Sequence, residues 1–287
     1  MTKQLIVVTG GSGALGQQVI AELFRHGWEV LSLDRRPHPG GHKRSWVVDL
    51  LDSGAVYEAC QGAAGIVHLA AHIAPDLASD CATFGDNVRM TYNVLKAAID
   101  NKLEKIVLAS STAVYGFLYG RKGETPAYLP ADESHPTLPT DPYGLSKVVG
   151  ERVADSFAAR TNASITSLRF PGISYDPKYE RVQNLLNDPG FRAPGFWSYV
   201  DVRDAAVAVR LALSRNKPGH RVYNIACDTS NMRQPTSELI QTFYPGLPER
   251  RISSSTNWSG IDCSAARQEL GFVPLHRWEN APASNQT

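Results

Sequence analysis

Two residues with complementary chemistry, a tyrosine and a lysine, stand four positions apart in the middle of this 287-residue chain. Tyr143 and Lys147 fall in a stretch that predicts a helix from 143 to about 160, so both side chains would lie on one helix face. An ammonium group held near a phenol favours the phenolate and lowers the pKa of the tyrosine. Such a tyrosine could act as a general base near neutral pH. A tyrosine and a lysine at this spacing also occur by chance, so the pair gains weight only from its surroundings, such as Ser111 at the end of a predicted strand.

The start of the chain has a segment suited to binding a phosphate group. An apolar run at 5–8 predicts a strand, Gly10, Gly13 and Gly16 follow it, and 17–26 predicts a helix. The amides at a helix N-terminus have no partner within the helix and attract anions, while glycine keeps side chains away. An ordinary strand that ends in a glycine turn is the alternative. No Gly-Lys-Ser/Thr follows, which excludes a nucleoside triphosphate P-loop.

Alternating strands and helices between this segment and Tyr143 predict a doubly wound parallel sheet with right-handed crossovers. Ligands bind at the carboxyl ends of the strands in such a sheet. The expected strands lie at 28–33, 45–48, 65–69 and 105–109, and the expected helices at 54–60 and 84–100.

Acidic residues end two of these strands. Asp34 is placed to accept hydrogen bonds from both hydroxyls of an adenosine ribose, and a carboxylate there repels a 2′-phosphate, which favours NAD. Arg35 and Arg36 follow at once and would attract a 2′-phosphate, so NADP is the alternative. The arginines could equally be solvated loop charges, or one could stack on the adenine. Asp49 is a candidate for the adenine amino group or a simple turn residue.

Small and polar residues follow the strand expected at 65–69. Ala70 and Ala71 would let the backbone approach a ligand, and Asn87 could hold a water or a backbone carbonyl. His68 and His72 are four apart, but a strand that runs into a loop does not place them on one face. We therefore expect no metal site.

Composition excludes several classes of protein. A formal net charge of +1 gives no strong field for nucleic acid or an anionic membrane, and no apolar run reaches the roughly 18–20 residues of a membrane span. The apolar run near the N-terminus leads straight into the glycines and predicts a strand, not a signal peptide. The four cysteines are scattered without CxxC spacing, so we expect reduced thiols in a cytoplasmic protein.

Together these motifs resemble the extended short-chain dehydrogenase/reductase family, the NAD-dependent epimerase/dehydratase group. Besides the glycines, Asp34 and the tyrosine–lysine pair, the resemblance rests on Asp49-Leu50, His68-Leu-Ala-Ala71, Asn87, Ser111-Thr-Ala-Val-Tyr-Gly116, Leu168-Arg-Phe-Pro-Gly172, Ser198-Tyr-Val-Asp-Val-Arg-Asp204, Val222-Tyr-Asn-Ile-Ala226 and the stretch 262–272. It covers nearly the whole chain, which makes it specific for the family and much less so for the substrate. The implied fold is α/β: a Rossmann-type domain at 1–171, completed by about 199–226, with a small substrate-binding lobe at 172–198 and 227–287.

The resemblance implies an NAD-dependent enzyme with Ser111, Tyr143 and Lys147 as catalytic residues. Tyr143 would take the proton of a substrate hydroxyl while a hydride passes to the nicotinamide. Ser111 would hydrogen-bond the substrate oxygen, and Lys147 would also bind the nicotinamide ribose. The residues implied to contact the cofactor are Gly10, Gly13, Ala14, Leu15, Gly16, Asp34, Arg35, Asp49, Leu50, Leu69, Ala70, Ala71, Asn87, Tyr143, Lys147 and Phe170. Those implied to contact the substrate are His72, Ser111, Thr112, Tyr143, Arg192 and Trp197.

Two departures from the family pattern narrow the chemistry. Family dehydratases carry an Asp-Glu pair after the catalytic Ser/Thr, where this chain has Thr112-Ala113, so a dehydratase is excluded. Nucleotide-sugar epimerases usually carry an arginine that clamps a diphosphate where this chain has Trp197, whose ring face suits a sugar instead. We therefore expect a dehydrogenase of a free sugar or sugar acid, with a nucleotide-sugar epimerase as the alternative. A dinucleotide-sensing regulator is the non-enzyme alternative, but such relatives typically lose the active-site tyrosine.

The expected lid over the substrate spans 175–196. It carries Lys178, Arg181 and Arg192, which are candidates for an anionic substrate group or solvated surface charges. Family members often dimerise through the helices that contain Asn87 and follow Tyr143, so a homodimer is the expected partner. Residues that could supply part of that face, or of the core, are Val148, Val149, Val153 and Phe157.

Overall fold

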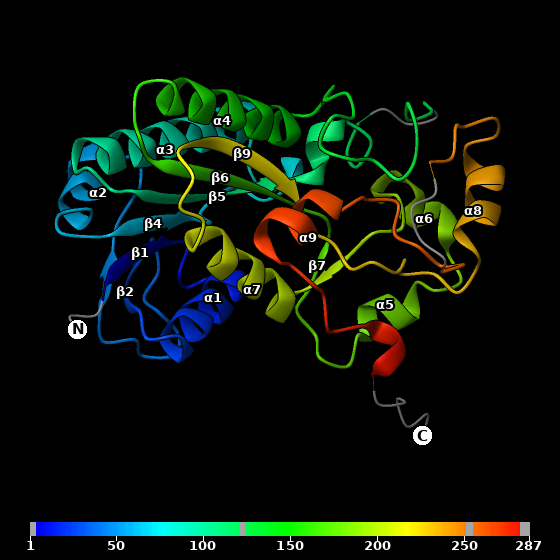
Figure 1. Ribbon diagram of the computed structural model, residues 1–287, viewed down its shortest axis with the longest axis horizontal. Coiled ribbons are helices and arrows are strands. Elements are labelled where there is room, and N and C mark those ends of the chain that lie inside the picture. Colours follow the sequence, from blue (N-terminus) through cyan, green and yellow to red (C-terminus); the bar gives the residue numbers. More distant parts are fainter. Residues whose placement is uncertain (1–3, 121–123, 251–254, 282–287) are drawn as a thin grey trace.

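The computed structural model describes residues 4–120, 124–250 and 255–281, and a seven-stranded parallel sheet forms its centre (Figure 1). The strand order is β3-β2-β1-β4-β5-β6-β9, and every neighbouring pair is parallel. The strands are β1 (Leu5–Thr9), β2 (Glu29–Asp34), β3 (Ser45–Val47), β4 (Gly65–His68), β5 (Lys105–Ser111), β6 (Ser164–Phe170) and β9 (Gly219–Asn224). The predicted fold class, a Rossmann-type doubly wound sheet, is confirmed.

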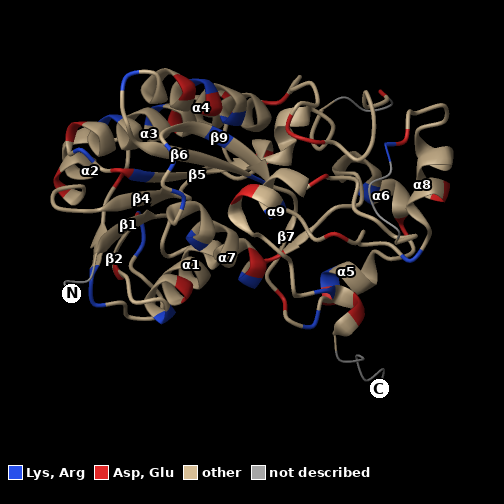
Figure 2. Cartoon of the chain, in the orientation of Figure 1, with Lys and Arg blue, Asp and Glu red and all other residues tan. Residues whose placement is uncertain are grey.

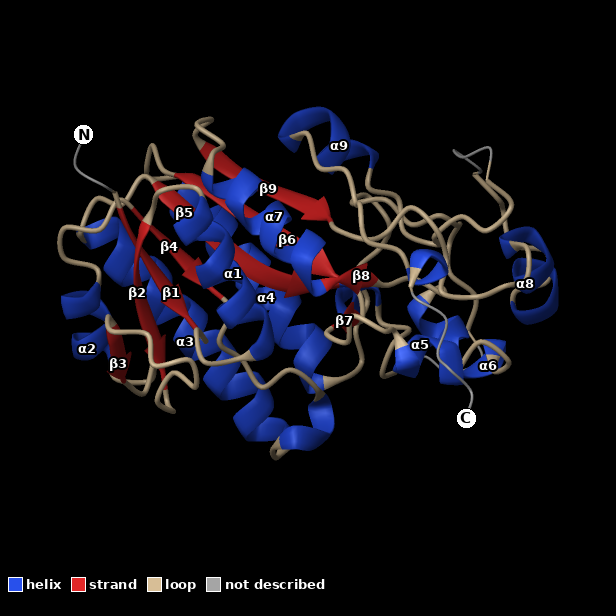
Figure 3. Cartoon of the chain, turned by 90° about the horizontal axis from the view of Figure 1, so that it is seen from below, coloured by secondary structure: helices blue, strands red, loops and turns tan. Residues whose placement is uncertain are grey.

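Helices cover both faces of this sheet (Figure 1 and Figure 3). One face carries α1 (Ala14–Arg25) and α7 (Val202–Leu213), and the other carries α2 (Ser53–Ala59), α3 (Asp80–Asp100) and α4 (Pro142–Ala158). The chain order reverses at β1, which has β2 on one side and β4 on the other. The crevice at the carboxyl end of β1 is therefore the switch point at which ligands bind in folds of this kind.

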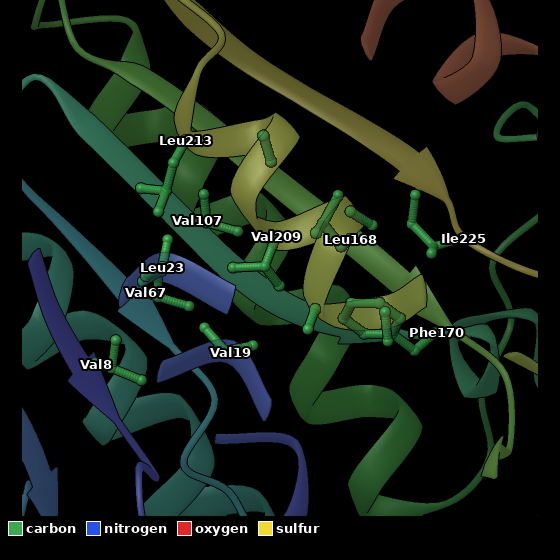
Figure 4. Close-up of a cluster of buried hydrophobic side chains, with 14 of the residues drawn as sticks. Val8, Val19, Leu23, Val67, Val107, Leu168, Phe170, Val209, Leu213 and Ile225 are labelled. Carbon is green, nitrogen blue, oxygen red and sulfur yellow. The ribbon is translucent and has the colours of Figure 1, made fainter. Parts of the chain in front are cut away.

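The sheet is buried on both faces, and side chains alternate between two cores. Val8, Val67, Val107 and Leu168 point from four adjacent strands toward α1 and α7 (Figure 4). Val7, next to Val8, belongs to the cluster on the α2–α4 face. This burial explains why the strands predicted at 5–8, 28–33, 65–69 and 105–109 are largely apolar runs.

A smaller lobe lies beyond the carboxyl end of the sheet (Figure 1). A short two-stranded parallel sheet pairs β7 (Ile173–Ser174) with β8 (Val200–Asp201). Helices α5 (Glu180–Asn184), α6 (Pro189–Arg192), α8 (Thr236–Phe243) and α9 (Ser264–Leu270) belong to the C-terminal half, and short 3-10 helices span Pro75–Leu77, Thr112–Tyr115, Ala193–Gly195 and Trp278–Asn280. An aromatic cluster around Phe196, Trp197 and Tyr244 forms the core of this lobe, and it also includes Tyr115 and Phe117 from the segment after β5.

The helix starts follow capping residues in the sequence. Ser79 accepts a hydrogen bond from the Ala82 amide, so α3 begins four residues earlier than predicted. Asp52 caps α2, because its side chain accepts hydrogen bonds from the Gly54 and Ala55 amides. The cysteines Cys60, Cys81, Cys227 and Cys263 are all unpaired.

Charged residues of both signs are interspersed over the helices and loops (Figure 2). Within 4–120, 124–250 and 255–281, no helix is long and apolar enough to span a bilayer. In the same ranges, no group of three or more His, Cys, Asp or Glu residues could hold a metal ion.

Candidate active site

The structure brings the three predicted catalytic residues together at the carboxyl end of β5. Ser111 is the last residue of β5, Tyr143 lies in the first turn of α4, and Lys147 follows one turn later. The Ser111 and Tyr143 hydroxyl groups are hydrogen-bonded. The Lys147 Nζ lies 5.6 Å from the centre of the Tyr143 ring and donates a 2.8 Å hydrogen bond to the Ala109 carbonyl.

The local sequence explains why Tyr143 faces Ser111. Asp141 accepts a 2.7 Å hydrogen bond from the Gly144 amide and Pro142 takes the first helical position, which fixes the start of α4. The helix rests on the backbone of the Thr112–Tyr115 turn, because a Cβ at Gly144 would lie 2.7 Å from the Ala113 carbonyl oxygen. Only glycine allows this close approach.

Burial dominates the acid–base properties of the pair. It raises the pKa of Tyr143, and the hydrogen bond with Ser111 opposes that rise. Burial also lowers the pKa of Lys147 to about 8, although the nearby Glu151 carboxylate favours the charged form. The prediction that Lys147 lowers the pKa of Tyr143 is wrong for the chain by itself. The physical reason is that desolvation of the phenolate outweighs the favourable contacts in a site closed on most sides.

The glycine turn fits a pyrophosphate. Gly10 has a φ of +70°, and a Cβ on it would lie 2.7 Å from the Ala70 amide nitrogen. At Gly16 a Cβ would lie 2.2 Å from the Gly10 carbonyl oxygen. Helix α1 begins at Ala14 with no side-chain cap at Gly13 and no acidic residue in its first turn. Its first amides therefore remain available to an anion.

Asp34 stands at the end of β2, next to this turn. Its Oδ2 accepts a 3.1 Å hydrogen bond from the Ser12 amide, and its Oδ1 accepts one of the same length from the Arg36 amide. Each carboxylate oxygen keeps acceptor capacity for a ribose hydroxyl. The side chains of Arg35 and Arg36 are exposed, and neither forms an ion pair within the described residues, so both the NAD and the NADP alternatives fit this edge.

Asn87 ties the loop after β4 to the helices by binding a backbone carbonyl, which is one of the two roles that the sequence suggested. Its Oδ1 accepts from the His72 amide at 2.8 Å, and its Nδ2 donates to the His72 carbonyl at 3.0 Å and to the Ser146 Oγ at 3.1 Å. The His72 ring lies 3.0 Å from Asp86. Leu69 and Ala70 continue this loop, and both amides donate to the Thr9 hydroxyl.

Three other predicted cofactor residues have structural roles in the chain itself. Asp49 accepts a 3.0 Å hydrogen bond from the Leu51 amide, which is the turn role that the sequence left open. Leu50 and Phe170 are buried in the apolar clusters on opposite faces of the sheet.

Trp197 differs from its prediction. The sequence suggested an indole face for a sugar ring, but Trp197 is fully buried and packs against Phe243 and Tyr244. Its Nε1 donates to the Pro189 carbonyl at 2.9 Å. The lobe uses this large ring as core, which removes it from any substrate surface. Arg192, the other substrate candidate in the lobe, makes no hydrogen bond or ring contact with Ser111, Tyr143 or Lys147 within the described part of the chain. Burial lowers the pKa of its guanidinium group.

Two tyrosines that the sequence did not mark as site residues lie beside Tyr143 instead. The Tyr119 ring lies edge-on to the Tyr143 ring at 5.9 Å and is 40 % exposed. Tyr175, 48 % exposed, is also close enough to influence the pKa of Tyr143. Arg181 is close enough to Tyr119 to oppose the rise in its pKa. Tyr119 and Tyr175 lie in irregular loops, where no periodic pattern or motif marks them.

Comparison with known proteins places the chain in a family. The sequence pattern of the NAD-dependent epimerase/dehydratase family matches residues 6–174, more than half of the chain. The chain belongs to this family. The match spans the glycine turn, the three catalytic candidates and the strands that position them, so the family part of the expectation is confirmed.

Curated relatives include both dehydrogenases and epimerases. An L-arabinose 1-dehydrogenase (NAD(P)(+)) of Haloferax volcanii is 33 % identical, over 57 % of this chain and 65 % of its own length, which is less than two thirds. A UDP-glucose 4-epimerase of Corynebacterium glutamicum is 26 % identical, over 94 % of this chain and 91 % of its own. A uronate dehydrogenase of Pseudomonas putida is 29 % identical, over 64 % of this chain and 72 % of its own length.

Solved structures share the fold at lower sequence identity. A short-chain dehydrogenase/reductase superfamily protein from Agrobacterium tumefaciens with bound NAD has a TM-score of 0.73 and 24 % identity, covering 97 % of this chain and 94 % of the other. The UDP-glucose 4-epimerase of Thermotoga maritima with UDP-glucose also has a TM-score of 0.73, at 20 % identity and coverage of 97 % and 96 %. These likenesses establish the fold.

Proposed function

We propose that this chain is an NAD-dependent dehydrogenase that oxidises a hydroxyl group of a free sugar or a sugar acid. The observation that carries the proposal is the placement of Ser111, Tyr143 and Lys147 at the same sheet edge as the open glycine turn. Nicotinamide dinucleotides bind at this edge in folds of this type, and the family depends on NAD.

The chain's own groups supply binding and proton transfer. The amides at the start of α1 would hold the pyrophosphate, and Asp34 would accept the adenosine ribose hydroxyls. NAD supplies the hydride acceptor when bound. Tyr143 would take the proton of the substrate hydroxyl, and Ser111 would donate a hydrogen bond to the same oxygen. Lys147, one turn away from Tyr143 on α4, would bind the nicotinamide ribose.

The lobe supports a small substrate more than a nucleotide sugar. Trp197 occupies the position from which family epimerases extend a diphosphate-binding arginine, and it is buried. Tyr119 and Tyr175 offer partly exposed rings beside Tyr143, and aromatic faces pack well against sugar rings. Arg181, near Tyr119, could pair with the carboxylate of a sugar acid.

A nucleotide-sugar epimerase is the second candidate. The observation in its favour is the match to the UDP-glucose 4-epimerase of Corynebacterium glutamicum, which spans nearly all of both chains. An epimerase returns the hydride to its substrate, so it accumulates no NADH, whereas a dehydrogenase does.

The test is a substrate panel with NAD and, separately, NADP, read by the absorbance of the reduced cofactor. We expect free aldoses or uronic acids to give net reduction with the wild-type protein. Tyr143→Phe should abolish turnover while its affinity for NAD, measured by calorimetry, stays the same. Interconversion of UDP-sugars with no net reduction would support the epimerase and overturn the lead proposal. Full biological activity of Tyr143→Phe would favour a dinucleotide-sensing regulator.

The proposal includes a cytoplasmic homodimer formed through α3 and α4. These helices lie side by side on one face of the sheet (Figure 1) and expose Tyr92 and Leu145, which are 47 % and 42 % exposed. Phe157, named above as a candidate for this face, is buried in the core. Sedimentation of the wild type and of Leu145→Glu checks the dimer. A monomeric wild type would contradict it.

A further inference from the structure

A serine, a histidine and an aspartate are aligned away from the active-site edge. The Ser167 Oγ lies 2.8 Å from the His220 Nε2, and the His220 Nδ1 lies 2.7 Å from the Asp155 Oδ1. The three residues come from β6, β9 and α4. The His220 side chain is 3 % exposed, whereas the Asp155 carboxylate is half exposed. The row therefore leads from the interior to solvent.

The order of the three groups is that of a hydrolytic triad, but the site cannot hydrolyse a substrate. Ser167 lies in the middle of the buried strand β6 and is 1 % exposed, so no ester or amide could reach its hydroxyl. The hydroxyl, the imidazole and the carboxylate are still hydrogen-bonded in a row, and a proton can pass along such a row.

A small cavity joins this row to the catalytic lysine. It has a volume of about 20 Å³, and both Lys147 and Ser167 line it, together with the polar residues Ser110, Ser146 and Glu151. A polar space of this size holds one water. Lys147, Glu151 and Asp155 are four residues apart on α4, so they lie on the helix face that packs against the sheet.

We propose that the cavity, Ser167, His220 and Asp155 form a relay that carries protons between Lys147 and solvent. The proposal rests on the proposed function, because net oxidation of a hydroxyl by NAD releases one proton per turnover and an epimerase releases none. The ammonium of Lys147 gives a proton to the cavity water. The water gives a proton to the Ser167 Oγ as Ser167 gives its own to the His220 Nε2. The His220 Nδ1 then releases its proton to Asp155 and bulk water. Each transfer breaks one N–H or O–H bond and forms another, and no electrons move.

The groups around the cavity favour this route. Glu151 is held by a bidentate ion pair with Arg169, with contacts of 2.9 and 2.8 Å, and accepts a 2.6 Å hydrogen bond from Ser110. This fixed carboxylate stabilises a positive charge in the cavity without moving. His68 also lines the cavity, but burial and the charge of Lys147 lower its pKa to about 3. It therefore stays neutral and does not trap the proton.

The test is the rate at which the ammonium protons of Lys147 exchange with water. The rate is measured by ¹⁵N NMR on lysine-labelled protein saturated with NAD, near pH 6, with the signal assigned by its loss in Lys147→Met. Bound NAD would lie over the sheet edge beside Lys147 and limit exchange by that route. We expect Ser167→Ala and His220→Gln each to slow exchange roughly tenfold, because each removes one proton-transfer partner. Glutamine keeps the hydrogen-bonding capacity of the site but cannot relay a proton.

Arg152→Ala is the matched control. Arg152 contacts the Asp155 Oδ2 at 3.2 Å from the solvent side and stands outside the relay, so exchange should be unchanged. Unchanged exchange in both Ser167→Ala and His220→Gln, at unchanged melting temperature, overturns the relay. The measurement needs no substrate, so its result is separable from the substrate panel. Slowed exchange in a chain that oxidises no sugar would refute the proposed function and leave the relay standing.

Discussion

Replacing Lys147, the lysine of the candidate active site, should make this protein more stable, and the gain should depend on pH. The pKa of Lys147 falls from its usual 10.5 to about 8 because the ammonium is desolvated in the fold. At 1.36 kcal/mol per pKa unit, that fall corresponds to about 3 kcal/mol of destabilisation at pH 7. Lys147→Met removes this cost but loses the hydrogen bond to the Ala109 carbonyl, which is worth about 1 kcal/mol. We expect a net gain of about 2 kcal/mol at pH 7.

The pH dependence separates this explanation from better packing of methionine. The folded wild type gives up the Lys147 proton as the pH rises through about 8, while the unfolded chain still binds it until about 10.5. The unfolded state therefore binds more protons in this window, and the wild type gains stability relative to the variant as the pH rises. Between pH 7 and pH 9.5 the difference should change by about 2 kcal/mol in favour of the wild type.

Urea denaturation of both proteins at the two pH values, without nucleotide, measures the difference. Lys43→Met, at an exposed lysine before β3, controls for the general loss of a positive charge. A Lys147→Met protein that is less stable than the wild type at pH 7, or a difference that does not change with pH, would refute the reasoning.

Three further predictions concern the nucleotide edge and the core beneath it. Gly16→Ala should abolish NAD binding in calorimetry and destabilise the fold, because the alanine Cβ would lie 2.2 Å from the Gly10 carbonyl oxygen. An unchanged affinity for NAD would contradict this tight packing. Asp34→Ala should shift the ratio of kcat/KM toward NADP by about tenfold, since one carboxylate no longer repels a 2′-phosphate, and an unchanged ratio would count against its ribose role. Glu151→Gln should lower the free energy of unfolding by about 3–5 kcal/mol in urea denaturation, because the buried Arg169 guanidinium loses its charged partner. A loss of less than 1 kcal/mol would mean that water or another group takes the place of the Glu151 carboxylate.

Much of the fold could be predicted because its signals are local. Continuous apolar strands, glycine turns and capping residues such as Asp52 mark the βα units in order, and parallel βα units admit few topologies. The family motifs then place Ser111, Tyr143 and Lys147 in one site. Strands, glycine turns and helix caps depend on local backbone geometry and on the burial of whole strands, so a short segment of sequence is enough to indicate each of them.

The sequence by itself therefore determined the doubly wound sheet, the nucleotide edge and the choice of Ser111, Tyr143 and Lys147 as catalytic candidates. Tertiary structure decided what depends on how distant segments pack. It buried Trp197 in the lobe core, placed Tyr119 beside Tyr143 and raised the pKa of that tyrosine by desolvation. It also aligned residues as far apart as Asp155 and His220, which share no motif. Exposure and electrostatic environment are properties of the assembled three-dimensional neighbourhood, and no local pattern of residues carries them.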